Sequence, residues 1–475
     1  MQETKTVKIK KCPYCFRNIS NDDVGFLLRA DGARFLSPAL NEVVAPKTDL
    51  AYLYFWNAMG IPEEQVDANR TYIDNQIMTE LNQELTASGH DLAVKHFDVD
   101  SFGYSFHVEE GAVTLYSNTM LCPHCHNELP QNFFKYDMLM IGLAGSVASG
   151  KTVYLSSLMM NSFDVMQREN LTVRNACGNP NDEYRMEMER NAERLLRYGI
   201  CPESTNKTFR KPIFLEVTYR VSEHVIHMLT AIYDVAGELI RESAGVGRTG
   251  FVRHMDGYIC LVDPAQMHLE HSFITQQIPD EARVLEKLHL MTKEEQISIQ
   301  RMSNDNGKQV MNQDDFLRER AVSDEFIYER KAEAILDALR TGVGDHELHQ
   351  KYMALTIAKS DLLEELGEIR GFPGSSLLFE RNRPIYGFMD MDHHFLRQEV
   401  LKQIFDQKVF RLQRNLEDYK ESSLFAVSAL GCETENVRLE EGEVARAVGK
   451  VRPIRVEEPI LWMMMKYMQE RGWLE

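Results

Sequence analysis

The sequence of 475 residues has no apolar run of the length that crosses a bilayer, which takes about 18 residues. The apolar stretch at residues 461–468 is too short and contains Lys466. Residues 1–11 are polar and rich in lysine, without the apolar segment of a secretory signal. These absences predict a cytoplasmic protein with no membrane span. In that compartment thiols stay reduced, so disulfides between the eight cysteines are not expected.

Basic residues are also in the minority, since 53 Lys and Arg stand against 72 Asp and Glu and give a net charge of −19. Binding along a nucleic-acid backbone needs a basic face. The balance therefore argues against a nucleic-acid partner, although a local basic patch would be compatible with one. With 44% hydrophobic and 26% charged residues the composition is globular. The length predicts two or three domains.

Residues 145–152 form a phosphate-loop pattern, G-x-x-x-x-G-K-T. Apolar residues 138–141 predict a strand before it, and apolar residues at helical spacing predict a helix after it. A strand, a glycine-bounded loop and a helix are the context in which this motif binds phosphate. Lys151 would reach the β- and γ-phosphates, and Thr152 would hold Mg²⁺. The loop residues predicted to surround the phosphates are Gly145, Ser146, Val147, Ala148, Ser149 and Gly150. A glycine-rich turn without a ligand is the alternative.

Two C-P-x-C pairs stand far apart, at Cys12 and Cys15 and at Cys122 and Cys125. Four such thiolates form the usual structural zinc site. The intervening segment predicts a zinc ribbon with a domain-sized insertion between its two halves. His124 and His126 stay open as substitute ligands. A thioredoxin-like redox motif would explain one pair but not both.

The insertion has a mixed pattern. Apolar residues four apart predict an amphipathic helix over 73–85, and alternation over 97–116 predicts strands. No catalytic set is visible in this segment.

Downstream of the phosphate loop, residues 213–221 and 224–233 alternate like two strands of a hairpin. The second strand ends in Asp234, followed by Gly237. A carboxylate at that position suits Mg²⁺ coordination through water, and a glycine lets a backbone N–H approach the γ-phosphate. Further apolar strands are predicted at residues 258–262, 354–358 and 424–427.

The last two of these strands run into Lys-Ser-Asp at residues 359–361 and Ser-Ala-Leu at residues 428–430. In this order the motifs resemble those of the TRAFAC-class P-loop GTPases, and the hairpin is similar to that of their translation-factor and Ras-like members. The resemblance implies bound GTP or GDP, with Mg²⁺ held by Thr152 and Asp234. It also implies that Asp361 pairs with the guanine N1–H and exocyclic amine and that Lys359 lies along the base plane. The backbone around Ser428 and Ala429 would meet guanine O6.

The sequence departs from the family at two positions. Ala358 stands where the family has Asn or Thr, so a hydrogen bond that braces the phosphate loop is missing. Glu238 stands where Ras-like members often carry Gln, and it either orients water or repels the γ-phosphate. The first departure predicts weaker nucleotide binding, and the second predicts slow intrinsic hydrolysis that a partner protein would raise. The switch threonine is expected at Thr205 or Thr208, and Thr208 is nearer the strand; the predicted catalytic residues are Lys151, Glu238 and Thr208.

The predicted architecture is α/β. Residues 1–133 form a zinc-ribbon module with an α+β insertion. Residues 134–475 form a P-loop GTPase domain that has a mostly parallel sheet with one antiparallel hairpin, helices on both faces and helical inserts near 265–350 and 365–420.

This layout resembles the bacterial double-GTPase family of conflict and signalling systems. The resemblance implies a GTP-hydrolysing molecular switch that acts on protein partners through the inserts and the zinc module. A nucleotide-bound scaffold or adaptor with little turnover, and an ATPase of the P-loop class, are the alternatives.

Overall fold

The structure is a computed structural model, and it describes only part of the chain. The described residues are 7–28, 38–74, 76–77, 79–80, 83, 87, 93–100, 103–110, 113–145, 149–159, 170–177, 183–202, 210–234, 251–263, 335–344, 346–361, 375–378, 388–408, 416–439 and 442–474.

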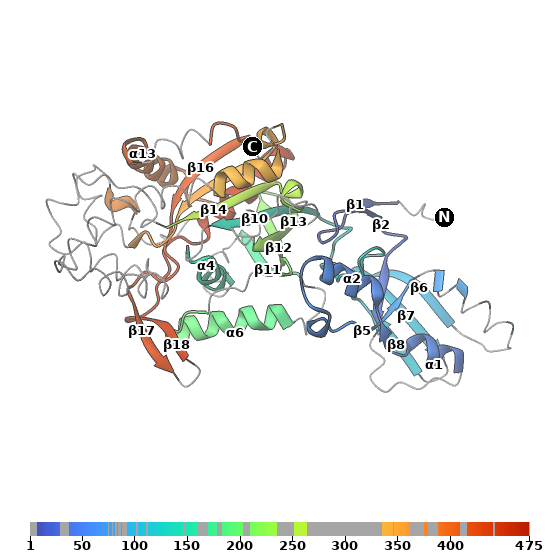
Figure 1. The fold of residues 1–475 in the computed structure, drawn as a ribbon. Helices are drawn as coiled ribbons and strands as arrows, with labels where there is room; N and C mark the ends of the chain where they lie inside the picture. Colours follow the sequence, from blue (N-terminus) through green and yellow to red (C-terminus); the bar gives the residue numbers. More distant parts are fainter. Residues whose placement is uncertain are drawn as a thin grey trace.

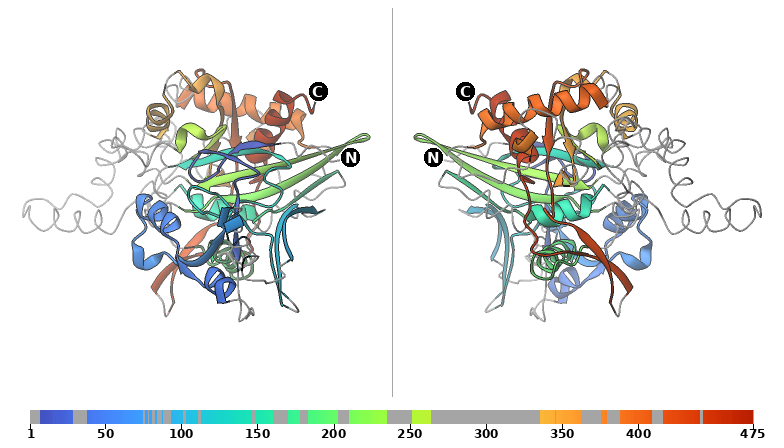
Figure 2. Two further views of the ribbon diagram at one scale, coloured as in Figure 1. Left: turned by 90° about the vertical axis from the view of Figure 1, so that its right-hand side faces the viewer. Right: turned by 90° about the vertical axis from the view of Figure 1, so that its left-hand side faces the viewer.

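A seven-stranded sheet forms the centre of the molecule (Figure 1). Its strands, in spatial order, are β11 (Leu171–Asn175), β12 (Ile213–Val221), β13 (His224–Asp234), β10 (Asp137–Gly145), β14 (Gly257–Val262), β15 (Tyr352–Ile357) and β16 (Glu421–Ala426). The strands from β13 to β16 are parallel, whereas β12 and β11 run antiparallel to their neighbours. This confirms the mixed α/β class, the mostly parallel sheet and the predicted hairpin, which reaches past the neighbouring strands in Figure 2.

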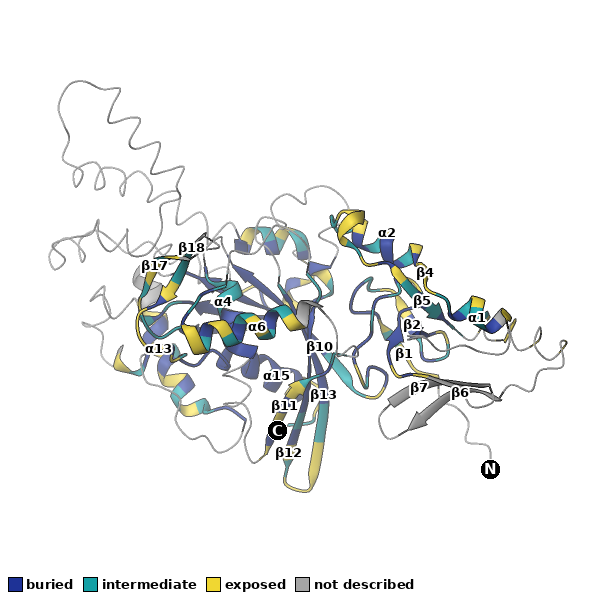
Figure 3. Cartoon of the chain, turned by 90° about the horizontal axis from the view of Figure 1, so that it is seen from below, coloured by how far each residue is buried: buried dark blue, intermediate teal, exposed yellow. Residues whose placement is uncertain are grey.

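Each face of the sheet is covered by its own apolar cluster. On one face, Leu139 and Ile141 of β10 belong to the cluster that includes α4 (Lys151–Ser157), α6 (Glu183–Tyr198) and α15 (Glu458–Glu470). On the other face, Met140 and Ala144 share a cluster with α13 (Met391–Lys408) and the helical residues 335–343. Figure 3 shows the result, a buried sheet beside an α6 that keeps one side exposed.

The position of β10 determines where a ligand can bind. The helix that follows β10 packs on one face of the sheet, whereas helical residues 335–343, which precede β15, pack on the other. Connections that diverge to opposite faces mark a topological switch point, and ligands of open α/β sheets bind at the carboxyl ends of the strands there. The phosphate-loop sequence begins at this end of β10, where Gly145 is the last strand residue.

The amino-terminal part contains smaller sheets. One has the order β4-β5-β3-β9 and another the order β6-β7-β8. A third sheet consists of β1 and β2. The helices and strands of this part are β1 (Ile9–Lys11), β2 (Asn18–Ser20), β3 (Gly25–Leu28), α1 (Pro38–Val44), β4 (Lys47–Thr48), α2 (Leu50–Ala58), β5 (Asn69–Ile73), β6 (Ala93–Asp100), β7 (Gly103–Glu110), β8 (Val113–Ser117) and β9 (Met120–Leu121). The strands predicted within 97–116 are therefore confirmed.

The helix predicted over 73–85 is wrong at its first residue. Ile73 ends β5, where it pairs with Phe26 and is fully buried. Burial of alternate side chains decides the conformation there, because Thr71 and Ile73 point into the core while Tyr72 between them is only partly covered. Residues 76–77, 79–80, 83 and 87 are helical, and Leu81 and Leu85 lie outside the described residues.

The segment around the first C-P-x-C pair packs directly on the central sheet. The Tyr233 hydroxyl donates to the Pro13 carbonyl over 2.7 Å. Tyr14 meets Phe214 edge to face, and Phe16 stacks on His254 with 4.5 Å between ring centroids. The cysteine-bearing segment is therefore part of the cover of the sheet.

Among the described helices, we find none whose length and apolar character would suffice for a membrane crossing.

Asp256, just before β14, gives the fold a pH dependence. Its carboxylate accepts from the Met140 N–H over 2.7 Å, and burial raises its pKa to about 6. Because the folded pKa exceeds the unfolded value, the group opposes folding increasingly as pH rises from about 4 to about 6. We expect Asp256→Asn, which keeps the acceptor, to raise the free energy of unfolding at pH 8 by up to about 3 kcal/mol and to have little effect at pH 4.

Denaturant unfolding at the two pH values measures this difference. Asp137→Asn is the control, because that side chain is 42% exposed. Equal effects of Asp256→Asn at both pH values would contradict the assignment.

Candidate functional site

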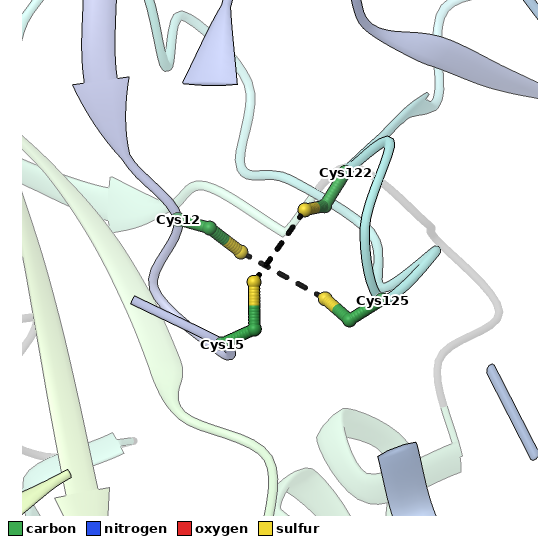
Figure 4. Close-up of side chains that lie close together, drawn as sticks. All are labelled: Cys12, Cys15, Cys122 and Cys125. Carbon is green, nitrogen blue, oxygen red and sulfur yellow. Dashed lines mark hydrogen bonds between the residues drawn. The ribbon is translucent and has the colours of Figure 1, made fainter. Parts of the chain in front are cut away.

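The four predicted cysteine ligands come together. Their sulfur atoms lie within 4.8 Å of one another, and all four point toward one centre in Figure 4. The Sγ atoms of Cys12 and Cys125 are 3.9 Å apart, and those of Cys15 and Cys122 are 3.8 Å apart. A tetrahedral zinc with bonds of about 2.3 Å separates its sulfurs by about 3.8 Å. The cluster is therefore compatible with zinc.

The two C-P-x-C loops have the same backbone structure. Phe16 N–H donates to the Cys12 carbonyl over 3.0 Å, and His126 N–H donates to the Cys122 carbonyl over 2.9 Å. Phe16 and His126 both adopt left-handed backbone, with φ of 57° and 50°. In each loop the second residue after the first cysteine directs its N–H at that cysteine's sulfur over 3.4 Å. The loops are thus equivalent halves of one site, although 106 residues separate Cys15 from Cys122.

The histidines left open as ligands are not part of this cluster. Among the described residues, the potential metal-binding group contains the four cysteines and no histidine. The His126 ring instead contacts Asp49, with 2.8 Å between Nδ1 and Oδ1, and stacks on Tyr72. Burial raises the pKa of the Cys12 and Cys125 thiols, so a bound cation is needed to hold all four as thiolates.

The described part of the phosphate loop is built as the motif requires. A Cβ atom on Gly145 would lie 2.6 Å from Ser149 Oγ and 2.9 Å from the Leu261 carbonyl oxygen, so only glycine fits. Gly150 has a left-handed φ of 83° and precedes the first turn of α4, which contains Lys151 and Thr152. The Lys151 ammonium donates to the Gly145 carbonyl over 2.7 Å, across the mouth of the loop. Ser146, Val147 and Ala148 lie outside the described residues.

Asp234 lies next to the phosphate loop. It ends β13 and is in register with Leu143 of β10. Burial raises the pKa of its carboxyl, and the positive charges of Lys151 and Arg210 oppose that shift. Its Oδ1 atom is buried and has no hydrogen-bond partner in the described part of the chain. The predicted residues Thr205, Thr208, Gly237 and Glu238 are outside that part.

The predicted base-reading residues follow the ends of β15 and β16, at the same edge of the sheet. Burial raises the pKa of the Asp361 carboxyl, and a hydrogen bond from Ser428 opposes that shift. The Asp361 Oδ1 atom is buried without a hydrogen-bond partner among the described residues. The Ser428 hydroxyl also accepts from the Gly431 N–H over 2.8 Å, which fixes the turn that contains Ala429.

Lys359 contacts both the residue that follows β14 and the phosphate loop. Its ammonium lies 2.6 Å from Asp263 Oδ2, and its Cε lies 3.9 Å from where a Cβ of Gly150 would stand. Asp263 follows β14, is fully buried and was not among the predicted site residues. The rule that selected Asp234, an acid directly after an apolar strand, would also have selected Asp263.

Residues 451–456, near the carboxyl end, connect two parts of the structure. One is the predicted base loop, residues 428–430, and the other is α4, the helix that follows the phosphate loop. Ser428 and Ile454 exchange backbone hydrogen bonds of 3.0 and 2.7 Å, and Arg452 N–H donates to the Leu430 carbonyl over 2.7 Å. The Tyr154 hydroxyl of α4 donates to the Val456 carbonyl over 2.7 Å. The sequence pattern did not indicate this strap, which joins the turn at Ser428 to α4.

A hairpin, β17 (Thr434–Leu439) with β18 (Gly442–Ala447), is inserted between the base loop and the strap. It lies beside the end of α6 in Figures 1 and 2. Ala447 N–H donates to the Gly199 carbonyl over 2.7 Å, and Cys201 N–H donates to the Ala445 carbonyl over 2.9 Å. The hairpin thus fixes residues 199–201, which directly precede the stretch that contains Thr205 and Thr208.

Comparisons with known proteins assign no family. No family profile matches the chain, and no curated protein matches it. The chain is similar to a solved structure titled "Crystal Structure Analysis of sup35 complexed with GDP", at 12% identity and a TM-score of 0.19. The match covers 62% of this chain and 38% of that one, so it spans well under half of the other protein's length. At this identity and TM-score the likeness carries no functional argument, and the site is interpreted from its own residues.

The cysteine cluster predicts one zinc per chain. We expect Cys122→Ser to abolish stoichiometric zinc and to lower the melting temperature, because three thiolates close the shell poorly and the site joins two distant segments. Cys177→Ser is the matched control, since Cys177 is half-buried and outside the cluster.

Elemental analysis of reduced protein and thermal melts measure both effects. Zinc-free wild-type protein, or a Cys122→Ser variant with full zinc content, would contradict the four-sulfur site.

Proposed function

We propose that the protein is a P-loop GTPase that binds GTP and GDP with Mg²⁺, hydrolyses GTP slowly and acts as a molecular switch on protein partners. The zinc site has a structural role in this proposal, because a closed set of four thiolates leaves no position for a substrate.

The observation that carries the proposal is a set of buried oxygen atoms at the carboxyl edge of the sheet. Within the described part of the chain these atoms have no hydrogen-bond partner; they are Ser149 Oγ, Asp234 Oδ1, Ser360 Oγ and Asp361 Oδ1. Each such group costs about 1–3 kcal/mol when it stays unpaired. They lie at or beyond the carboxyl ends of β10, β13 and β15, on the side of the phosphate-loop glycines. A magnesium nucleotide in this position would supply partners for them.

The residues of the phosphate side have distinct roles in this proposal. Lys151 would exchange its bond to the Gly145 carbonyl for the β- and γ-phosphate oxygens. Thr152 and Asp234 would hold Mg²⁺, which, when bound, neutralises charge that develops on the phosphates. Thr208 and Gly237 would respond to the γ-phosphate, and Glu238 would act on the attacking water. Order in these segments would then depend on the γ-phosphate, as a switch requires.

Asp361 supports guanine over adenine. Its carboxylate can accept hydrogen bonds from the guanine N1–H and the exocyclic amine, whereas adenine presents an acceptor at N1. The buried Oδ1 atom is available for such a bond among the described contacts. The wild-type protein should therefore bind GTP and GDP much more tightly than ATP. Equal affinities in a fluorescent-nucleotide titration would favour the ATPase alternative, and binding to neither would end the nucleotide proposal.

A nucleotide-bound scaffold with little turnover is the second candidate. Ala358 favours it, because the methyl side chain offers no hydrogen bond to the phosphate loop, and its N–H is used by the Val262 carbonyl over 2.8 Å. Turnover measurements separate the two candidates.

Asp361→Asn is the sharpest test of base recognition. We expect it to weaken GTP binding by about 1–3 kcal/mol, since a charged hydrogen bond is lost and a guanine donor is left unpaired. Preference should move toward xanthine nucleotides, whose edge carries an acceptor where guanine has the amine.

Competition between GTP and xanthosine triphosphate measures this change. Asp418→Asn is the control, because Asp418 pairs with Arg340 through an exposed contact. An unchanged preference in Asp361→Asn would remove Asp361 from the site.

Hydrolysis by the isolated protein should be far slower than typical enzyme turnover of about 10 s⁻¹. If Glu238 orients water, Glu238→Ala should slow hydrolysis while GTP binding stays intact. If Glu238 only repels the γ-phosphate, the same change should tighten GTP binding and leave the rate equal or higher. Single-turnover assays without a partner measure the rate. Fast wild-type hydrolysis would contradict a partner-dependent switch, and no hydrolysis would favour the scaffold.

A further inference from the structure

We infer that Asp263 is a positioning residue for guanine-nucleotide binding, which it supports by holding Lys359 against the phosphate loop. This inference rests on the proposed function and extends it to a residue that no motif covers. The starting observation is the 2.6 Å contact between the Lys359 ammonium and Asp263 Oδ2.

Asp263 occupies a central place in the edge of the sheet. It directly follows β14, which pairs with β10 on one side and β15 on the other. β10 leads into the phosphate loop, and β15 leads into the Lys359–Asp361 motif. The Asp263 side chain is 1% exposed, so its carboxylate is screened from water. A carboxylate buried to this degree requires a cationic or hydrogen-bonding partner.

The Lys359 side chain reaches this carboxylate with its stem against Gly150 of the phosphate loop. The residue adopts left-handed backbone, with φ of 52°, and its side chain remains 32% exposed. Its Cε lies against Gly150, 3.9 Å from where a Cβ would stand. One end of the lysine is therefore fixed by the sheet, and its apolar stem lies over the second glycine of the loop. This orientation leaves the stem at the side of the site where the resemblance to GTPases puts the base.

The contact replaces a brace that the sequence lacks. Ala358 cannot bond the phosphate loop through its side chain, as an Asn or Thr at that position would. Here the link from the base motif to the phosphate loop is the contact of the Lys359 stem with Gly150, and Asp263 holds that lysine in place. Charge pairing holds the lysine in place before a nucleotide arrives, which lowers the ordering cost of binding.

Asp263→Asn is the test, because it keeps the shape of the side chain and removes its charge. We expect affinity for GTP and GDP to fall by about ten- to a hundredfold, the range for losing a charged hydrogen bond. The two nucleotides should be affected equally, since the pair acts on the base side and not on the γ-phosphate. The ratio of GDP to IDP affinity should stay at its wild-type value, because that ratio reports the Asp361 contact to the exocyclic amine.

A double-mutant cycle separates this role from a general structural one. If Asp263 acts through Lys359, Asp263→Asn should cause no further loss in a Lys359→Met background. Asp263→Glu keeps the charge and should retain more affinity than Asp263→Asn, which also provides a variant to measure if the Asn substitution prevents folding. Asp418→Asn is the surface control.

The outcomes are distinguishable. Wild-type protein that binds no guanine nucleotide refutes the proposed function itself. Wild-type protein that binds, with Asp263→Asn binding equally well, refutes the positioning role alone. Additive losses in the double mutant would also overturn it, because Asp263 would then act independently of Lys359.

Discussion

Polar groups that are removed from water need partners, and the carboxyl edge of the central sheet buries several of them together. The chain solves the problem in two ways. Asp263 receives an internal partner, the Lys359 ammonium at 2.6 Å. Asp234 and Asp361 each keep a buried oxygen atom without a hydrogen-bond partner in the described part of the chain. In the proposed function, this difference separates an acid that organises the site from acids that would meet a ligand.

The cysteine cluster and this edge are mechanically connected although their chemistry differs. The first cysteine loop packs on the face of the sheet, where the Tyr233 hydroxyl bonds the Pro13 carbonyl. Tyr233 is the residue before Asp234, so one strand end receives support from the metal-binding loop and lies in the proposed nucleotide site. The cysteine-bearing segment therefore stabilises the strands beneath it through apolar burial, in addition to any bonds to a metal.

The features that could be predicted from the sequence are those whose signal is local. Buried parallel strands read as short apolar runs, and a phosphate loop or a cysteine pair has a fixed spacing. Ile73 fitted the helical spacing of the residues after it, but its burial beside Phe26 places it in a strand. Asp263 has no motif around it, but like Asp234 it stands at the end of an apolar strand, which is a local signal. The strap at residues 451–456 could not be predicted, because its contacts to Ser428 and Tyr154 involve backbone groups that carry no sequence signature.

The late position of the strap in the sequence also determines which parts of the protein can fold first during synthesis. The cysteine set is complete once Cys125 has left the ribosome, and β10 begins at Asp137. The base loop, by contrast, needs Ile454 for its backbone pairing, and α4 needs the Val456 carbonyl. A growing chain can thus fold its cysteine-bearing part early, while its proposed nucleotide site stays incomplete until translation has passed Val456. Nascent chains of intermediate length would therefore contain the complete four-cysteine set without the proposed nucleotide site.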